Sequence, residues 1–156
     1  MMTRKSAGLL LYRRRGEDTE VFLVHPGGPI WAGRDAGAWS IPKGEFGPEE
    51  DPLSAAVREF EEETGAELKK KSSFIPLTPV KQRNNKLVYA WAVEGDADAG
   101  PVKSNTFPLE WPPRSGKIRE FPEIDRAGWF TIEEAGEKIF DGQIGLLDEL
   151  EKILSA

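Results

Sequence analysis

Cysteine is absent from this chain of 156 residues, and histidine occurs once, as His25. Without cysteine the chain can form no disulfide and no thiolate metal site, and a single histidine rules out a His-rich site. Any metal must therefore be held by oxygen ligands, which favour Mg²⁺, Mn²⁺ or Ca²⁺. No apolar run approaches the roughly 18 residues of a membrane span, so we expect no membrane partner.

The charge balance is acidic, with a formal net charge of −6 at pH 7. This argues against general binding to nucleic acid, although it leaves room for a local basic pocket. The basic N-terminal residues precede only a short apolar run that ends at Arg13, and no small-residue cleavage site follows. We therefore interpret this segment as a first strand rather than a signal peptide, and we expect a cytoplasmic protein.

Strand and helix signals together predict one α/β domain over residues 1–156, with a mixed β-sheet and helices packed on it. Predicted strands cover 7–14, 20–26, 38–44, 74–80, 86–95 and 127–130, with a Gly-rich loop at 27–37 and a turn at 81–85. A long loop rich in proline and aromatics is predicted at 96–123, and a loop of this length is usually functional or disordered. A capping box at Thr131 and Glu134 begins one helix, and an amphipathic helix at 142–154 closes the chain.

The clearest helix signals lie between Asp51 and Gly65. Asp51 is a good N-cap, Pro52 suits the first helical position, and Gly65 is a good C-terminal stop. One stripe of this helix is predicted to face the core, formed by Leu53, Ala56, Val57, Phe60 and Thr64.

A different side of the same helix is predicted to carry Glu59, Glu62 and Glu63, which are spaced as i, i+3 and i+4. Three carboxylates at this spacing can converge on one point, where a divalent cation would offset their repulsion. Glu61 belongs to another face and is expected to be solvated. The alternative is that the whole acidic face is merely solvated, which is common on acidic proteins.

The run from Gly44 to Ala66, "GEFGPEEDPLSAAVREFEEETGA", resembles the Nudix box, G-x5-E-x7-R-E-U-x-E-E-x-G-U with U bulky and aliphatic. All the charged positions and both glycines match. The two departures are an aromatic Phe60 and a small Ala66 at the apolar positions. The flanking runs "AGLLLYRR", "WSIPKGEFGPEE" and "FPEIDRAGWFTIEEA" resemble the family as well, and the resemblance implies a Nudix-like α/β/α sandwich.

The resemblance also implies hydrolysis of a diphosphate bond in a nucleoside diphosphate linked to another group, with Mg²⁺ or Mn²⁺ as cofactor. It makes Glu59, Glu62 and Glu63 metal ligands, and it brings the backbone of Gly44 close to the metal. Glu50 and Arg58 would pair and keep the acids oriented. The catalytic base stays open between Glu59, Glu120 and Glu123, since family members differ on its place. Lys43 is a candidate phosphate contact or a solvated turn residue.

The substrate is less clearly indicated, because the family's ADP-ribose and dinucleoside polyphosphate markers are both absent at residues 82–84. The aromatic and basic residues of the long loop suit a nucleotide with a long polyphosphate, or else they simply pack the loop. These candidate substrate contacts are Trp111, Arg114 and Lys117, with Arg119 nearby. The run "WSIPKG" most resembles that of the family's dinucleoside polyphosphate and diphosphoinositol polyphosphate branch, and this resemblance favours a dinucleoside polyphosphate or a nucleoside triphosphate.

Three alternatives remain at this stage. The chain could be a nucleotide-sensing Nudix domain without catalysis, or an enzyme on ADP-ribose-type or diphosphoinositol polyphosphate substrates. It could also be an acidic interaction module without metal, which would leave the spacing of Gly44, Glu50, Arg58 and Gly65 unexplained. His25 is expected to be structural, and Trp39 is expected to pack in the core.

Overall fold

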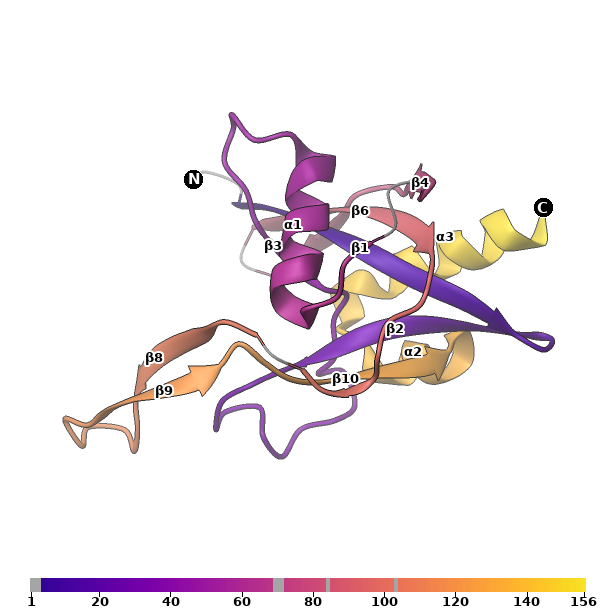
Figure 1. The fold of residues 1–156 in the computed structure, drawn as a ribbon. Coiled ribbons are helices and arrows are strands. Elements are labelled where there is room, and N and C mark those ends of the chain that lie inside the picture. The colour runs from indigo at the N-terminus through magenta and orange to yellow at the C-terminus, as the bar shows by residue number, and fades with distance from the viewer. Residues whose placement is uncertain (1–3, 69–71, 84, 103) are drawn as a thin grey trace.

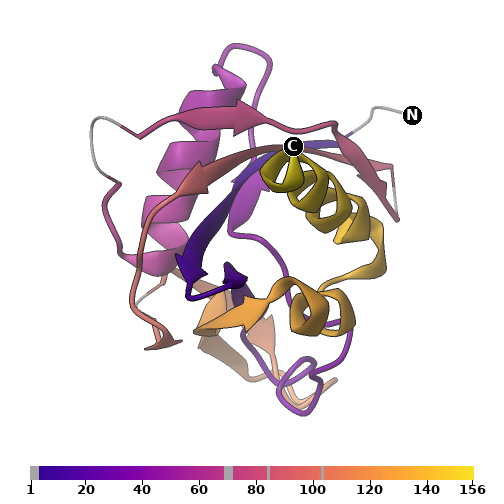
Figure 2. The same ribbon diagram turned by 90° about the vertical axis from the view of Figure 1, so that its right-hand side faces the viewer.

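A mixed β-sheet forms the middle layer of the molecule, with α1 (Pro52–Thr64) on one face and α2 (Ile132–Lys138) and α3 (Ile144–Ser155) on the other (Figure 1; Figure 2). The structure, a computed structural model, describes residues 4–68, 72–83, 85–102 and 104–156. The predicted α/β/α sandwich is therefore confirmed. Within the described residues, no helix is long and apolar enough to cross a membrane.

The sheet runs in the order β4-β6-β1-β2-β10-β7, and β3 and β5 pair with β1 and β6. Its only parallel pair among the described strands joins β1 to β6. The bounds are β1 (Arg4–Arg15), β2 (Asp18–Pro26), β3 (Lys43–Glu45), β4 (Phe74–Pro76), β5 (Val80–Gln82), β6 (Lys86–Glu94), β7 (Gly100–Pro101) and β10 (Ile124–Thr131). A separate two-stranded hairpin is formed by β8 (Thr106–Glu110) and β9 (Ile118–Pro122).

Strand β1 lies at the centre of the sheet and is buried on both faces, as its nearly continuous apolar run requires. Leu9 and Leu11 point into the core beneath α1, together with Phe22 and Phe60. Leu10 points into the opposite core beneath α2 and α3, where the other members include Trp39, Ile139, Leu146, Leu147 and Leu150. Trp39 is thus buried as predicted.

The helix predictions agree closely with the structure. Asp51 caps α1 by accepting a hydrogen bond from the Ser54 N–H at 3.0 Å, and Gly65 ends it in the left-handed conformation at φ 73°. The predicted capping box of α2 is present. The Thr131 N–H donates to Glu134 at 2.9 Å, and the Glu134 N–H donates back to the Thr131 hydroxyl at 3.2 Å.

Three loop and strand predictions need correction. The predicted strand 38–44 is reduced to isolated bridges at Trp39 and Ser40 followed by β3. The predicted strand 74–80 is split into β4 and β5, since Pro76 and Pro79 cannot donate to a ladder, and β5 extends into the predicted turn. The predicted long loop 96–123 contains β7 and the β8–β9 hairpin, whose alternating pattern is interrupted by Pro108 and Pro122.

Candidate functional site

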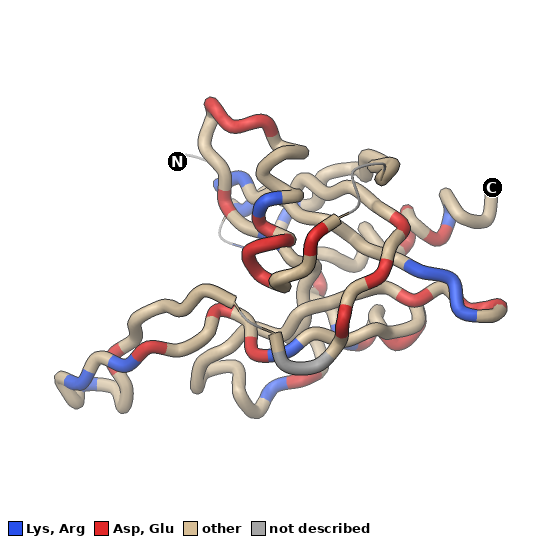
Figure 3. The backbone as a smooth tube through the Cα atoms, viewed as in Figure 1, with Lys and Arg blue, Asp and Glu red and all other residues tan. Residues whose placement is uncertain are grey.

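Helix α1 places the acidic residues on the side of the molecule that faces the base of the hairpin (Figure 3). The helix is fixed by its apolar stripe, in which Ala55, Ala56 and Phe60 are fully buried against the sheet. An α-helix has 3.6 residues per turn. Glu62 and Glu63, two and three positions after Phe60, therefore lie at the edge of the face that packs on the sheet. The site therefore rests on a rigid element.

Arg58 pairs with three of the acidic side chains of the site. Its Nε and Nη2 donate to the two carboxylate oxygens of Glu50 at 2.9 and 3.1 Å, which is the bidentate geometry of a strong ion pair. Its Nη1 donates to Glu59 Oε1 at 2.9 Å. These partners, Glu50 first, raise the pKa of Arg58 above its ordinary value. The predicted Glu50–Arg58 pair is confirmed.

The predicted convergence of three carboxylates on one point is not seen. Arg58 Nη1 contacts Glu59 closely and Glu62 more loosely, at 3.4 Å, while Glu63 turns away to accept a hydrogen bond from the Lys43 backbone N–H at 3.0 Å. Among the described residues, no three His, Cys, Asp or Glu side chains are grouped closely enough to hold a metal ion as they stand. Mutual repulsion and the available N–H donors explain this spread.

Burial disfavours the charged forms of the Glu59 and Glu63 carboxyls. Glu63 is largely shielded from water, and this raises its pKa to about 8, against the opposing hydrogen bond from Lys43. Burial likewise raises the pKa of Glu59, whose side chain is only 16% exposed. Burial, followed by the positive charge of Lys86, lowers the pKa of the Lys43 ammonium. Charged groups held out of water in this way are common at functional sites.

Gly44 is packed directly against Glu59. A Cβ at Gly44 would lie 2.0 Å from Glu59 Cδ and 2.1 Å from its Oε2, which is far inside van der Waals contact. Only a residue without a side chain leaves the carboxylate in its observed place. This gives a physical reason for glycine at the first position of the motif.

Glu123 lies near these acids, in the bend between β9 and β10. Its charge adds to the rise in the pKa of both Glu59 and Glu63. Together with Lys43 and Glu63 it lines a cavity of about 170 Å³. Glu120, the other candidate base from the loop, is exposed on β9 and lines none of the described cavities. The geometry thus separates the two loop acids and brings only Glu123 to the site.

A second cavity of about 260 Å³ adjoins the first, because Pro26 and Glu123 line both. Its other walls come from the loop 27–37, including Trp31, and from Phe107 and Leu109 of β8. Sequence analysis missed Trp31, since a lone tryptophan in a Gly-rich loop carries no spacing that points to a site. A larger hollow of about 410 Å³ between the β1–β2 turn and α3 includes none of the motif residues.

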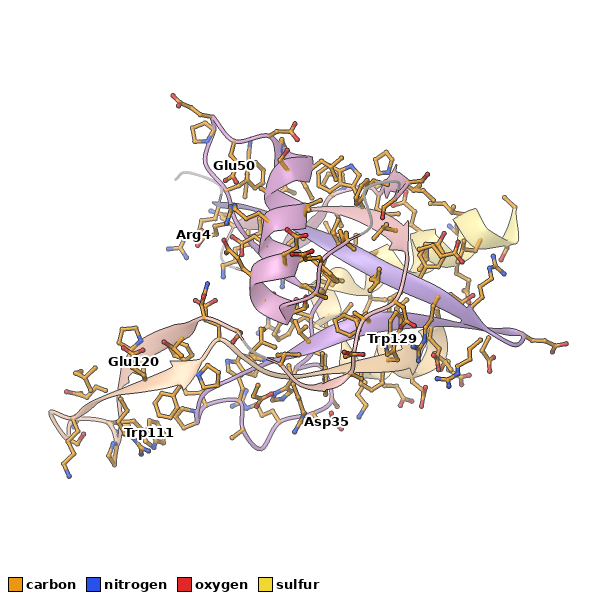
Figure 4. All side chains as sticks on the ribbon, viewed as in Figure 1. Arg4, Asp35, Glu50, Trp111, Glu120 and Trp129 are labelled. Atoms are coloured by element: carbon orange, nitrogen blue, oxygen red, sulfur yellow. The ribbon has the colours of Figure 1, made fainter. Side chains whose placement is uncertain are left out.

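The predicted substrate contacts Trp111, Arg114 and Lys117 lie in the turn that joins β8 to β9. This hairpin projects from the body of the molecule, and Trp111 lies on its outer part, away from α1 (Figure 1; Figure 4). None of the three lines the cavities at the acids. Lys43, by contrast, lies beside Glu63, which accepts a hydrogen bond from its backbone N–H and lines the same cavity.

Loop 27–37 is anchored by polar contacts at its C-terminal end. His25 is fully buried, and its Nε2 donates to the Arg34 carbonyl at 2.7 Å while its Nδ1 lies 2.9 Å from Asp125 Oδ1. Asp35 accepts a hydrogen bond from Trp39 Nε1 at 2.8 Å and pairs with Lys138. The expected structural role of His25 agrees with these contacts.

The donor set suits a hard divalent cation. Glu59 and Glu63 offer carboxylate oxygens, which Mg²⁺ and Mn²⁺ prefer, and Gly44 leaves space for the Glu59 carboxylate. Burial raises the pKa of both carboxyls, and the neighbouring charge of Glu123 adds to this rise; a bound cation would favour their charged forms. Glu62, exposed at the rim, is the third oxygen donor of the predicted set.

Comparison with known proteins assigns the fold. The NUDIX domain family model matches residues 2–150. No curated protein matches the sequence.

Three solved structures are similar to this chain over nearly its whole length. A C. elegans Ap4A hydrolase in a binary complex has 22% identity and a TM-score of 0.69, covering 96% of this chain and 98% of that one. The NUDIX domain of Shewanella oneidensis NrtR, complexed with ADP ribose, has 12% identity and a TM-score of 0.65, covering 99% of this chain and 90% of that one. A mutT/nudix family protein from Listeria innocua has 16% identity and a TM-score of 0.64, covering 99% of this chain and 96% of that one. At these identities the similarity is one of fold.

Proposed function

The chain belongs to the Nudix family, and from this premise we propose that it is a pyrophosphohydrolase dependent on Mg²⁺ or Mn²⁺. Its substrate is a nucleoside diphosphate linked to another group, with a dinucleoside polyphosphate or a nucleoside triphosphate favoured. One observation carries the proposal. The half-buried Glu63 lines one cavity together with Lys43 and Glu123, and the half-buried Glu59 packs against Gly44 next to it.

In this proposal Glu59, Glu62 and Glu63 hold the cation, next to the Gly44 backbone. A bound divalent cation neutralises phosphate charge and makes a bound water more acidic. Lys43 contacts a phosphate as a point charge. Arg58, fixed by Glu50, holds Glu59 in position.

The reaction forms a bond from a water oxygen to phosphorus and breaks the bridging P–O bond of the anhydride. A carboxylate accepts the proton that the water loses. Glu59 and Glu123 are the two candidates for this base: Glu123 lines the cavity, and Glu59 is close enough for the charge of Glu123 to affect its pKa. Trp111, Arg114 and Lys117 remain proposed contacts for a ligand long enough to extend along the hairpin.

The test is phosphate release from a panel of nucleoside triphosphates, diadenosine polyphosphates, ADP-ribose and NADH, with Mg²⁺ or with chelator. We expect metal-dependent release from one class. Glu59→Gln should lower that rate by about a hundredfold or more while leaving the circular dichroism spectrum unchanged. Glu61→Gln, on the same helix but outside the proposed ligand set, is the matched control and should retain the rate.

Two results would contradict the proposal. The first is wild-type protein that binds nucleotide but releases nothing with Mg²⁺, which would favour a sensing domain. The second is equal loss of rate in Glu59→Gln and Glu61→Gln, which would reduce the acids to a general charge effect.

A further inference from the structure

We propose that the cavity between loop 27–37 and β8 binds the flat aromatic base of the substrate, and that Trp31 and Phe107 select for it. We call this cavity the ring pocket; it is lined by Pro26, Gly27, Gly28, Pro29, Ile30, Trp31, Phe107, Leu109 and Glu123. The inference rests on the proposed function, because it assigns the organic end of the same substrate.

The chemistry of the ring pocket suits a planar ring with little charge. Trp31 and Phe107 contribute aromatic side chains, and Ile30 adds an apolar side chain that is 56% exposed. Among the described residues that line it there is neither Lys nor Arg, and Glu123 is the only charged one. Stacking on aromatic side chains is the usual way that proteins hold a nucleobase. A ring carrying several phosphates would instead need cationic groups and would meet the Glu123 carboxylate.

The hairpin forms one wall of the ring pocket because of its strand alternation. Phe107 and Leu109 are half-buried, while Thr106, Pro108 and Glu110 between and beside them are exposed. Residues two apart share one face of a strand, so Phe107 and Leu109 both point toward loop 27–37. Glu120 pairs with Pro108 across the hairpin and therefore belongs to the opposite face.

Two glycines allow the loop and the hairpin to approach this closely. Gly28 has φ +94°, and a Cβ there would lie 2.9 Å from Phe107 Cζ. At Gly27 a Cβ would lie 2.0 Å from the Pro122 carbonyl oxygen. The Gly27 N–H also donates to the Glu123 carbonyl at 2.9 Å, which ties the loop to the hairpin's end. The ring pocket is thus a built contact between two segments.

The ring pocket adjoins the acid site, and this arrangement favours a nucleotide as the ligand. Pro26 and Glu123 line both the ring pocket and the cavity that contains Lys43 and Glu63. A base bound against Trp31 and Phe107 would therefore have its phosphates next to the acids. A nucleotide has this arrangement of ring and phosphates, whereas a diphosphoinositol polyphosphate has phosphates in place of the aromatic ring.

The experiment compares two polyphosphates that differ in the ring, using the full chain with Mg²⁺. The probes are β,γ-methylene-ATP, which carries a base, and inorganic tripolyphosphate, which does not; calorimetry gives both affinities. We expect wild type to prefer the first probe by about tenfold or more. Phe107→Ala should remove most of this preference and leave tripolyphosphate binding unchanged, and Phe107→Tyr should restore it.

Further variants separate the pocket from general effects on the fold. Trp31→Ala should also remove the preference for the probe with a base, while Trp31→Phe should keep it. Trp31 packs edge-on against Phe140, with ring centroids 5.6 Å apart, so its loss affects packing as well. If Trp31→Ala fails to fold, the Phe107 variants alone test the pocket. Ile118→Ala removes a 66% exposed apolar side chain from the same hairpin and should leave both affinities unchanged.

The inference is overturned if Phe107→Ala weakens both probes equally, if it changes neither, or if Trp111→Ala removes the ring preference instead. Its failure is distinct from failure of the proposed function. Hydrolysis without ring discrimination contradicts the ring pocket alone. Ring discrimination without phosphate release contradicts the enzyme alone.

Discussion

At the scale of single residues, Gly44 decides where Glu59 can lie. The Glu59 carboxylate occupies the space that any side chain at Gly44 would need. Because the crowded atoms are the far end of a flexible side chain, a methyl group at Gly44 would displace the carboxylate more easily than the backbone. The cost should therefore appear in function rather than in stability.

We predict that Gly44→Ala lowers the hydrolysis rate by about a hundredfold, since small displacements of a catalytic group have effects of this size. Its free energy of unfolding should change by less than about 1 kcal/mol, as is usual away from the core. Rates and urea unfolding curves check both parts. Gly47→Ala, which meets no atom within 4 Å, is the control. A fully active Gly44→Ala protein would show that the position of Glu59 does not limit the reaction.

Contacts between residues close in sequence could be predicted from the sequence, whereas contacts between distant segments could not. The Glu50–Arg58 pair and the helical spacing of the acids are local, so they could be predicted. Glu123 was only one of two candidates in the loop. Its selection depends on how β10 pairs with β2, where Ile124 lies opposite Pro26. That non-local register has no signature in either segment alone.

At the scale of elements, loop 27–37 supplies five of the residues that line the ring pocket, residues 27–31. Asp35 connects this loop to α2 through Lys138 and to Trp39 through the indole N–H. These hydrogen bonds, that of Lys138 first, lower the pKa of Asp35 from its ordinary value of 3.8. A carboxyl whose pKa is lower in the folded state stabilises the fold above its unfolded pKa, and this contribution is lost as the pH falls through the folded value.

We predict that Asp35→Asn is less stable than wild type at neutral pH, and that the difference disappears as the pH falls below about 3.8. The Asp35 side chain is 56% exposed, so solvent limits the effect to at most about 1 kcal/mol. Urea unfolding over this pH range measures it. Asp148→Asn, exposed on α3, serves as control. A difference that persists at low pH would assign the effect to packing rather than charge.

The elements themselves were predictable where several local signals agreed. Helix α1 has a cap, a proline at its start, an apolar stripe and a glycine stop, and its bounds were predicted correctly. The β8–β9 hairpin was missed, because Pro108 and Pro122 conceal its alternation and its face is defined only by contact with loop 27–37. The strand predicted at 38–44 is interrupted, since residues before β3 pair only at two isolated positions, Ser40 with β2 and Trp39 with the end of α2.

At the scale of the whole molecule, the acid site and the opposite core share one sheet. Strand β1 contributes Leu9 and Leu11 to the core beneath α1 and Leu10 to the core beneath α2 and α3. The two cores should therefore unfold together in one transition. A ligand bound at α1 would then stabilise the entire chain by mass action.

We predict that Mg²⁺ raises the melting temperature and that chelator reverses the rise. At a hundredfold excess over the dissociation constant the stabilisation should be about 2.7 kcal/mol, which corresponds to a shift of several degrees. Tryptophan fluorescence and circular dichroism should report the same midpoint. The double variant Glu59→Gln, Glu63→Gln should lose most of the shift. An equal shift in that variant would place the cation elsewhere.

The β8–β9 hairpin leaves and rejoins the body at nearly one place. The Glu123 N–H donates to the Asn105 carbonyl at 2.8 Å, and the Ser104 hydroxyl exchanges hydrogen bonds with the Ile124 backbone at 3.1 Å. A segment closed at its root in this way can be exchanged as a cassette without disturbing the sheet. Exchange of the residues between Asn105 and Glu123 would then retune which substrates are accepted, while Glu123 and the acids of α1 stay in place.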